Sequence, residues 1–219
     1  MLNLYIIPEW FFNYSIILEL SFFLITLFIG VYALKVYKLS GQRLSKLFGF
    51  GFIMISLSYI FGIITNFIFI YKISTLQPIR LTTYVTLTHL ALYLHILFFL
   101  TGLVTLVYMA TNLKNFNTFS LLLALAIIPI TLTPSKLTTF QILSSILLIY
   151  INGYYLTRYL ANESKKNLLV LTSFMLLLIV NITLIFAVQN GTYYVVADLI
   201  SLIAYSLLLI KLIRIQKNE

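Results

Sequence analysis

The sequence predicts an all-α fold, a polytopic bundle of seven transmembrane helices, and three observations support this prediction. First, the chain is 62% hydrophobic and 9% charged, with a mean hydropathy of +1.07, whereas soluble domains usually have about 25% charged residues. Second, seven apolar stretches, most of them close to the roughly 20 residues that one bilayer crossing needs, occupy most of the chain. Third, the basic residues gather in the gaps on one side. We therefore expect a single transmembrane domain, residues 1–219.

The expected helices span residues 14–38, 47–71, 81–111, 118–133, 138–160, 167–188 and 192–214. The first ends before Ser40-Gly41 and the second before Gln77-Pro78, which are pairs that favour turns. The third is the longest apolar stretch, and it begins directly after Arg80. The fourth is the shortest, and Pro134-Ser135 ends it.

The last three helices are separated by polar segments in the same way. Lys165 and Lys166 lie between the fifth helix and the sixth, and Asn190-Gly191 precedes the seventh. After Arg214 only five residues remain, so no output domain is expected. Because no basic segment precedes the first apolar stretch, a cleaved signal peptide is not expected either.

The distribution of basic residues predicts the orientation. Eleven of the fourteen Lys and Arg residues fall on the side of the C-terminus, namely Lys35, Lys38, Arg43, Lys46, Lys114, Arg158, Lys165, Lys166, Lys211, Arg214 and Lys217. By the positive-inside rule the N-terminus is outside and the C-terminus is cytoplasmic. The net charge of +9 thus reflects membrane topology and lipid phosphates rather than nucleic acid. We expect a multi-pass protein of the cell membrane.

Ionisable side chains at membrane depth are costly and usually face the bundle interior, so they are the first candidates for a functional site. Glu19, His89 and Asp198 share one expected depth in the outer half, whereas His95 lies about 120° around its helix from His89. We assign His95 a role in helix packing. Interhelical hydrogen bonding without a ligand is the alternative role for the neighbouring Ser, Thr and Asn residues.

Helical spacing adds neighbours to these residues. Thr82, Thr86, His89 and Tyr93 share one face of the third helix, and Tyr194, Asp198, Ser201 and Tyr205 share one face of the seventh. We expect a polar cavity that opens outward and binds a small ligand through Glu19, Asn66, His89, Tyr93, Asn181, Tyr194, Asp198 and Ser201.

No catalytic residue, metal site or cofactor is predicted. Glu19, His89 and Asp198 could supply three metal ligands of an intramembrane hydrolase. However, the chain resembles the seven-helix ceramidase and adiponectin-receptor family only in helix count and lacks that family's histidines. The seventh helix resembles the last helix of microbial rhodopsins, but Leu202 stands where that family has its retinal-bearing lysine. An enzyme is therefore not expected.

One further resemblance concerns residues 5–59. The segments Ile7-Pro8-Glu9-Trp10-Phe11-Phe12, Tyr32-Ala33-Leu34-Lys35 and Leu39-Ser40-Gly41-Gln42-Arg43 resemble small seven-helix membrane proteins of archaeal type, a family without an assigned activity. In architecture the chain is also similar to the seven-helix input regions of sensor kinases. These resemblances concern architecture and imply no assigned activity.

Three functions fit these features. The first is a receptor-like or sensory module that binds a small, amphiphilic or cationic ligand in the outer half and acts through a cytoplasmic signalling partner. The second is a small-solute or proton-coupled transporter, for which an arrangement of three, one and three helices is an open possibility. The third is a noncatalytic membrane scaffold.

Overall fold

The computed structural model describes residues 8–74, 81–112, 115–162 and 168–217. Side chains are described for all of these except residues 9, 12, 65–74, 81–85, 162 and 215–217. Within this part of the chain all regular structure is helical, which confirms the predicted fold class. Six of the helices are long and apolar enough to cross a membrane.

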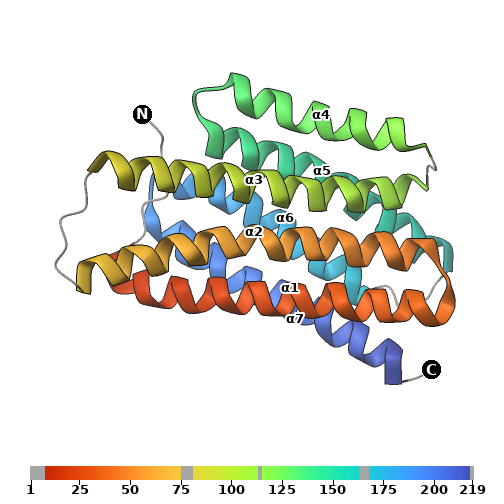
Figure 1. The fold of residues 1–219 in the computed structure, drawn as a ribbon. Coiled ribbons are helices and arrows are strands. Elements are labelled where there is room, and N and C mark those ends of the chain that lie inside the picture. Colours follow the sequence, from red (N-terminus) through yellow and green to blue (C-terminus); the bar gives the residue numbers. More distant parts are fainter. Residues whose placement is uncertain (1–7, 75–80, 113–114, 163–167, 218–219) are drawn as a thin grey trace.

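A short 3₁₀ turn, η1 (Glu9–Phe11), leads into the seven helices (Figure 1). These are α1 (Phe12–Ser40), α2 (Arg43–Ser74), α3 (Leu81–Thr111), α4 (Phe116–Leu132), α5 (Lys136–Asn162), α6 (Leu168–Ala187) and α7 (Gly191–Lys217). The third expected helix has the observed bounds, and α2 begins four residues earlier than expected, at Arg43 rather than residue 47. The α1–α2 turn is tight because Gly41 adopts φ +68°, a left-handed conformation that glycine accepts without strain.

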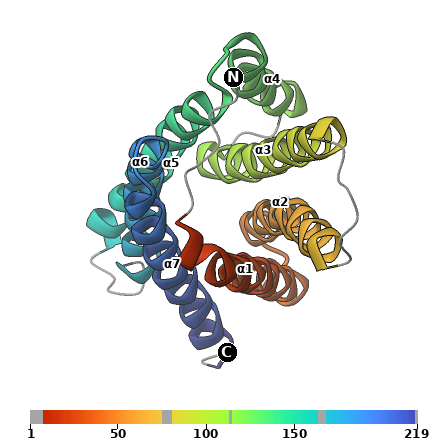
Figure 2. The ribbon, with the colours of Figure 1, turned by 90° about the vertical axis from the view of Figure 1, so that its left-hand side faces the viewer.

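Successive helices run in opposite directions, because the connecting segments are too short to return along the length of a helix (Figure 1). Six of them form a ring in the order α1, α2, α3, α5, α6, α7, which closes where α7 packs against α1 (Figure 2). The neighbours α3 and α5 run in the same direction, and so do α7 and α1. The ring therefore consists of two triplets, α1–α3 and α5–α7, whose helices follow the same order of directions, up, down and up.

The remaining helix, α4, lies outside this ring, against α3 and α5 (Figure 2). With 17 residues it is about 25 Å long, and Ala126 and Ile130 are its buried residues. Its first turn is capped by the Asn115 side chain, which accepts a hydrogen bond from the Asn117 amide at 3.0 Å. At its other end, Lys136 Nζ donates to the carbonyl oxygens of Ile130 and Thr133, both at 3.4 Å.

Glycine allows α2 to approach both of its neighbours closely. A Cβ at Gly30 of α1 would lie 3.0 Å from the carbonyl oxygen of Gly49, and a Cβ at Gly102 of α3 would lie 2.7 Å from that of Gly51. Gly49 and Gly51 are two residues apart and contact opposite neighbours. The two contacts fix α2 between α1 and α3 by backbone packing, as small residues commonly do in membrane helices.

The helices are staggered at one end of the bundle. At 1.5 Å per residue, α2 and α3 are about 46–48 Å long, which exceeds the roughly 30 Å of a hydrocarbon core. Figure 1 shows that they extend well beyond the ends of α4 and α5 at the end that holds the α2–α3 connection. Residues near the start of α3 therefore lie where α4 and α5 do not flank them.

Candidate functional site

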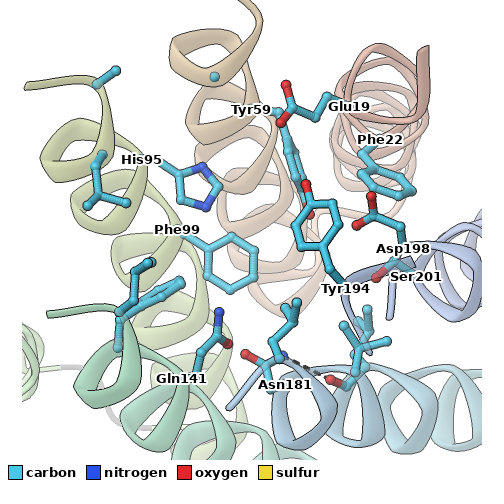
Figure 3. Close-up of a pocket in the computed structure, with 18 of the residues that line it drawn as sticks. Glu19, Phe22, Tyr59, His95, Phe99, Gln141, Asn181, Tyr194, Asp198 and Ser201 are labelled. Atoms are coloured by element: carbon cyan, nitrogen blue, oxygen red, sulfur yellow. Dashed lines mark hydrogen bonds between the residues drawn. The ribbon is translucent and has the colours of Figure 1, made fainter. Parts of the chain in front are cut away.

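A cavity of about 260 Å³ lies inside the ring, and every one of its six helices contributes to the lining (Figure 3). The lining residues are Glu19 and Phe22 of α1; Tyr59 and Gly62 of α2; Thr88, Ala91, Leu92, His95 and Phe99 of α3; Leu137, Phe140 and Gln141 of α5; Leu177, Val180, Asn181 and Leu184 of α6; and Tyr194, Asp198, Ser201 and Tyr205 of α7. No residue of α4 is among them. The cavity therefore depends on the ring, and α4 supports it only from outside.

Two carboxylic acids enter the cavity from adjacent helices. Glu19 and Asp198 each lie about 10 Å from the start of their helices, α1 and α7, and their charges are close enough to interact. The Glu19 carboxyl group extends to α2, where a Cβ at Gly62 would lie 3.2 Å from Oε2. Asp198 is 8% exposed, and its Oδ2 has no hydrogen-bond partner among the described residues. The expected inward orientation of both acids is thus observed.

Aromatic rings form the bottom of the cavity. The hydroxyl groups of Tyr59 and Tyr205 are 3.0 Å apart and share a hydrogen bond, and the Phe22 ring packs against both tyrosines at centroid distances of 5.5 and 5.8 Å. Tyr59 also lies within electrostatic reach of Glu19 and Asp198. This layer separates the acidic cavity from the rest of the bundle.

His95 is the histidine that lines the cavity. Its Nδ1 lies 3.1 Å from the carbonyl oxygen of Ser58, and its ring packs between Tyr59 of α2 and Phe140 of α5, at 5.8 and 6.0 Å. Figure 3 shows the imidazole directed from α3 toward the centre of the cavity. Its packing contacts agree with the role expected for it, but its place in the cavity lining was not expected.

At the opposite side of the lining, polar residues of α6 and α7 bond within their own helices. Asn181 Nδ2 donates to the Leu177 carbonyl oxygen at 2.9 Å, and Ser201 Oγ donates to that of Ala197 at 2.9 Å. Toward the N-terminal ends of α1 and α7, the Tyr194 hydroxyl shares a 3.0 Å hydrogen bond with Ser15 Oγ, and the Tyr194 ring packs against Phe11. Five predicted residues, Glu19, Asn181, Tyr194, Asp198 and Ser201, therefore meet in one cavity.

Two predicted residues lie elsewhere, which corrects the expected face of α3. Tyr93 is 39% exposed and its ring is contacted by Lys136 Nζ at 5.3 Å, while His89 is half-buried and does not line the cavity. The physical reason is the rotation of α3 about its own axis. Thr88, Leu92, His95 and Phe99 face the cavity, and His89 and Tyr93 each follow one of these residues, so they lie about 100° around the helix from that face. The side chain of Asn66 lies outside the described residues.

Sequence reasoning also missed several lining residues. Thr88, Leu92, His95 and Phe99 recur at intervals of four, three and four, and this stripe faces the cavity. The spacing was visible in the sequence, but the stripe through His89 has the same period and more polar members. Gly62 and Phe22 gave no signal, because an isolated glycine or phenylalanine in an apolar helix is unremarkable.

The chemistry of the cavity is acidic and aromatic. Among the described lining residues there are two carboxyl groups and one imidazole, and there is no Lys or Arg. Within the same described part of the chain, no three His, Asp or Glu side chains form a group that could hold a metal ion. The arrangement suits recognition of a small molecule with a positive charge or hydrogen-bond donors. No family model, curated protein or solved structure matches this chain.

Proposed function

We propose that this multi-pass membrane protein is a receptor-like or sensory module that binds a small ligand in the cavity formed by its six-helix ring. The observation that supports this proposal is the lining itself: all six helices contribute, and two acids meet an imidazole and several aromatic rings. Its volume of about 260 Å³ lies just below the roughly 300–1,000 Å³ typical of drug-sized ligands. A ligand there contacts every helix of the ring and can bias their relative positions.

The packing below the cavity favours a receptor over an open transport path. In the other half of the bundle the apolar side chains of Ile29, Phe52, Leu103, Phe174 and Leu208 are at most 2% exposed and close the core. The Asn152 side chain is also buried there, and its Nδ2 donates to the carbonyl oxygens of Leu148 and Phe174. The described basic side chains other than Lys136 lie at that end of the bundle, on α1, α2, α5 and α7. By the positive-inside rule this end is cytoplasmic, and we propose that an acidic signalling partner docks there.

The test is ligand binding by the full chain in lipid nanodiscs, screened by thermal stabilisation. Ala91 lines the cavity, so Ala91→Phe should occupy part of its volume and abolish stabilisation by any ligand bound there. Ser201→Leu reduces the same volume from α7 and serves as a second variant. The proposal fails if no small molecule stabilises the protein, or if both cavity-filling variants respond as the wild-type chain does.

A transporter is the second candidate, and the ring arrangement favours it. Two triplets, α1–α3 and α5–α7, run in parallel with the cavity between them, as in transporters whose repeats are related by an axis along the membrane normal. Proteoliposome flux of a ligand found in the binding screen decides between the two candidates. Flux that Ala91→Phe blocks would establish transport, whereas binding without flux supports the receptor. If neither occurs, a scaffold role remains.

A further inference from the structure

We propose that the ligand is a protonated primary or secondary amine with a small apolar body, and that its ammonium group donates a hydrogen bond to Asp198 Oδ2. This inference rests on the proposed function, because it names the ligand class for the same cavity. Three features of the cavity support it: the charge of the lining, the hydrogen bonding of Asp198 and the apolar wall.

The charge of the lining selects against anions. Glu19 and Asp198 lie close enough to interact electrostatically, and no Lys or Arg is among the described residues around the cavity. A negative group placed there would be repelled by an ionised carboxyl group, and charge interactions are stronger in a partly enclosed site than in open solvent. A cation placed near both acids gains attraction from each of them.

The hydrogen bonding of Asp198 restricts the ligand further, because it favours a cation that carries an N–H group. Oδ2 is buried and has no donor among the described residues, and a buried acceptor without a donor is unfavourable. The neighbouring Ser201 hydroxyl cannot supply one, because it donates its only proton to the Ala197 carbonyl oxygen. A ligand N–H group can supply this donor when the Asp198 carboxyl group turns its buried Oδ2 toward the cavity, which Asp198 lines. A quaternary ammonium has no N–H group and leaves Oδ2 unsatisfied.

The rest of the lining fits the body of such an amine. Phe22, Phe99 and Phe140 surround the space together with Leu92 and Leu137, so an aromatic or branched aliphatic group can pack there. The rings of Tyr59 and Tyr205 also offer faces that attract a cation. The cavity thus joins an acidic end, near Glu19 and Asp198, to an apolar wall (Figure 3).

The test uses four probes with one common body: 2-phenylethylamine, its N-trimethyl derivative, 2-phenylethanol and 3-phenylpropionate. Binding to the full chain in phosphatidylcholine nanodiscs is measured by calorimetry at neutral pH, with empty nanodiscs as the correction for partitioning into lipid. The amine should bind at least about tenfold more tightly than the trimethyl derivative and the alcohol, as expected for one hydrogen bond to a charged group. The carboxylate should not bind.

Substitutions test which side chains produce this preference for the amine. Asp198→Asn should reduce the preference for the amine over the trimethyl derivative to within a few-fold, while Tyr193→Phe, next to the lining residue Tyr194 but exposed, should leave it unchanged. Glu19→Gln should weaken both cations together, because it removes charge and leaves Oδ2 in place, and this keeps the test decisive if Asp198→Asn does not fold.

The outcomes separate this inference from the proposed function. Equal binding of the amine and the trimethyl derivative, or of the amine and the alcohol, overturns the inference while ligand binding stands. An amine preference that persists in Asp198→Asn also overturns it. If no probe binds above empty nanodiscs at millimolar concentration, this inference fails, and the proposed function then depends on the wider stabilisation screen.

Discussion

Gly62 is the residue that gives the Glu19 carboxyl group its room. It lies on α2 opposite α1, and a methyl group there would lie 3.2 Å from Glu19 Oε2, closer than most Cβ contacts in proteins. The carboxyl group would have to move by a few tenths of an ångström. The position of one of the two cavity acids thus depends on the absence of a side chain on the neighbouring helix.

Gly62→Ala should therefore weaken binding of a cationic probe by a few-fold. Alanine also favours the helix by about 1 kcal/mol relative to glycine, so stability should not fall markedly. Calorimetric dissociation constants and thermal unfolding are the measurements. Gly153→Ala is the matched control, because Gly153 has open space around its Cβ position. Identical affinities in the wild-type chain and Gly62→Ala would contradict the role given to Gly62.

The hydroxyl pair of Tyr59 and Tyr205 supports a second prediction. Their hydrogen bond at 3.0 Å connects α2 to α7 across the bottom of the cavity. Tyr59→Phe and Tyr205→Phe should each destabilise the fold, and the double variant should cost less than the two single ones added. We expect a coupling free energy of about 0.6 kcal/mol, the average for such bonds in a membrane protein. Unfolding in mixed micelles measures it, and additive effects would rule the bond out.

At the level of single residues, the sequence predicted the acids better than the histidine. Glu19 and Asp198 are isolated polar positions in apolar helices, so only one face is favourable for each. His89 and His95 lie on one helix that carries two polar stripes of the same period. Which stripe faces the cavity depends on how α3 is rotated about its axis when it packs against α2 and α5, and the local sequence does not contain that information.

At the scale of helices, glycine allows α2 and α3 to pack closely. Gly51 and Gly102 face each other across α2 and α3, and a Cβ at Gly102 would lie 2.7 Å from a backbone oxygen and 2.6 Å from Ile55 Cγ1. A backbone atom cannot give way as a flexible side chain does. The two helices would have to separate, and Ile55 would have to move from its buried position.

Gly102→Ala should accordingly destabilise the protein by about 1–3 kcal/mol, the usual cost of overpacking a tight interior. Unfolding in mixed micelles, compared with the exposed control Gly153→Ala, measures the effect. Because the strain lies between α2 and α3, deletion of the Ile55 side chain should relieve part of it, so Ile55→Ala combined with Gly102→Ala should be less than additive. A neutral Gly102→Ala would show that the two helices are less closely packed than described.

The predicted helices agree with the observed ones because bilayer thickness constrains each apolar stretch. The arrangement of those helices was less accessible to sequence reasoning. Nothing in residues 116–132 distinguishes a ring member from a helix on the outside, since exposed residues such as Leu121 and Leu125 contact lipid in either case. The parallel triplets were left open for the same reason: the contacts between helices are made by shape and not by a shared motif.

For the whole molecule, the orientation in the membrane is still a prediction, and the chain is well suited to test it because it contains no cysteine. Ser40 lies at the end of α1 and Ser135 at the start of α5, both exposed and at opposite ends of the bundle. A membrane-impermeant thiol reagent applied to intact cells should label Ser135→Cys and not Ser40→Cys. After permeabilisation both should react. The reverse pattern would invert the proposed topology.

The position of α4 has a consequence for how such a protein could have been assembled. A unit of three crossings leaves the bilayer on the opposite side from which it entered, so joining two such units head to tail would insert the second one upside down. In this fold α4 runs back along the bundle between α3 and α5, so both triplets start from the same end, and it does so without lining the cavity. Two separately translated three-helix chains that insert in one orientation could therefore associate into the same ring without α4.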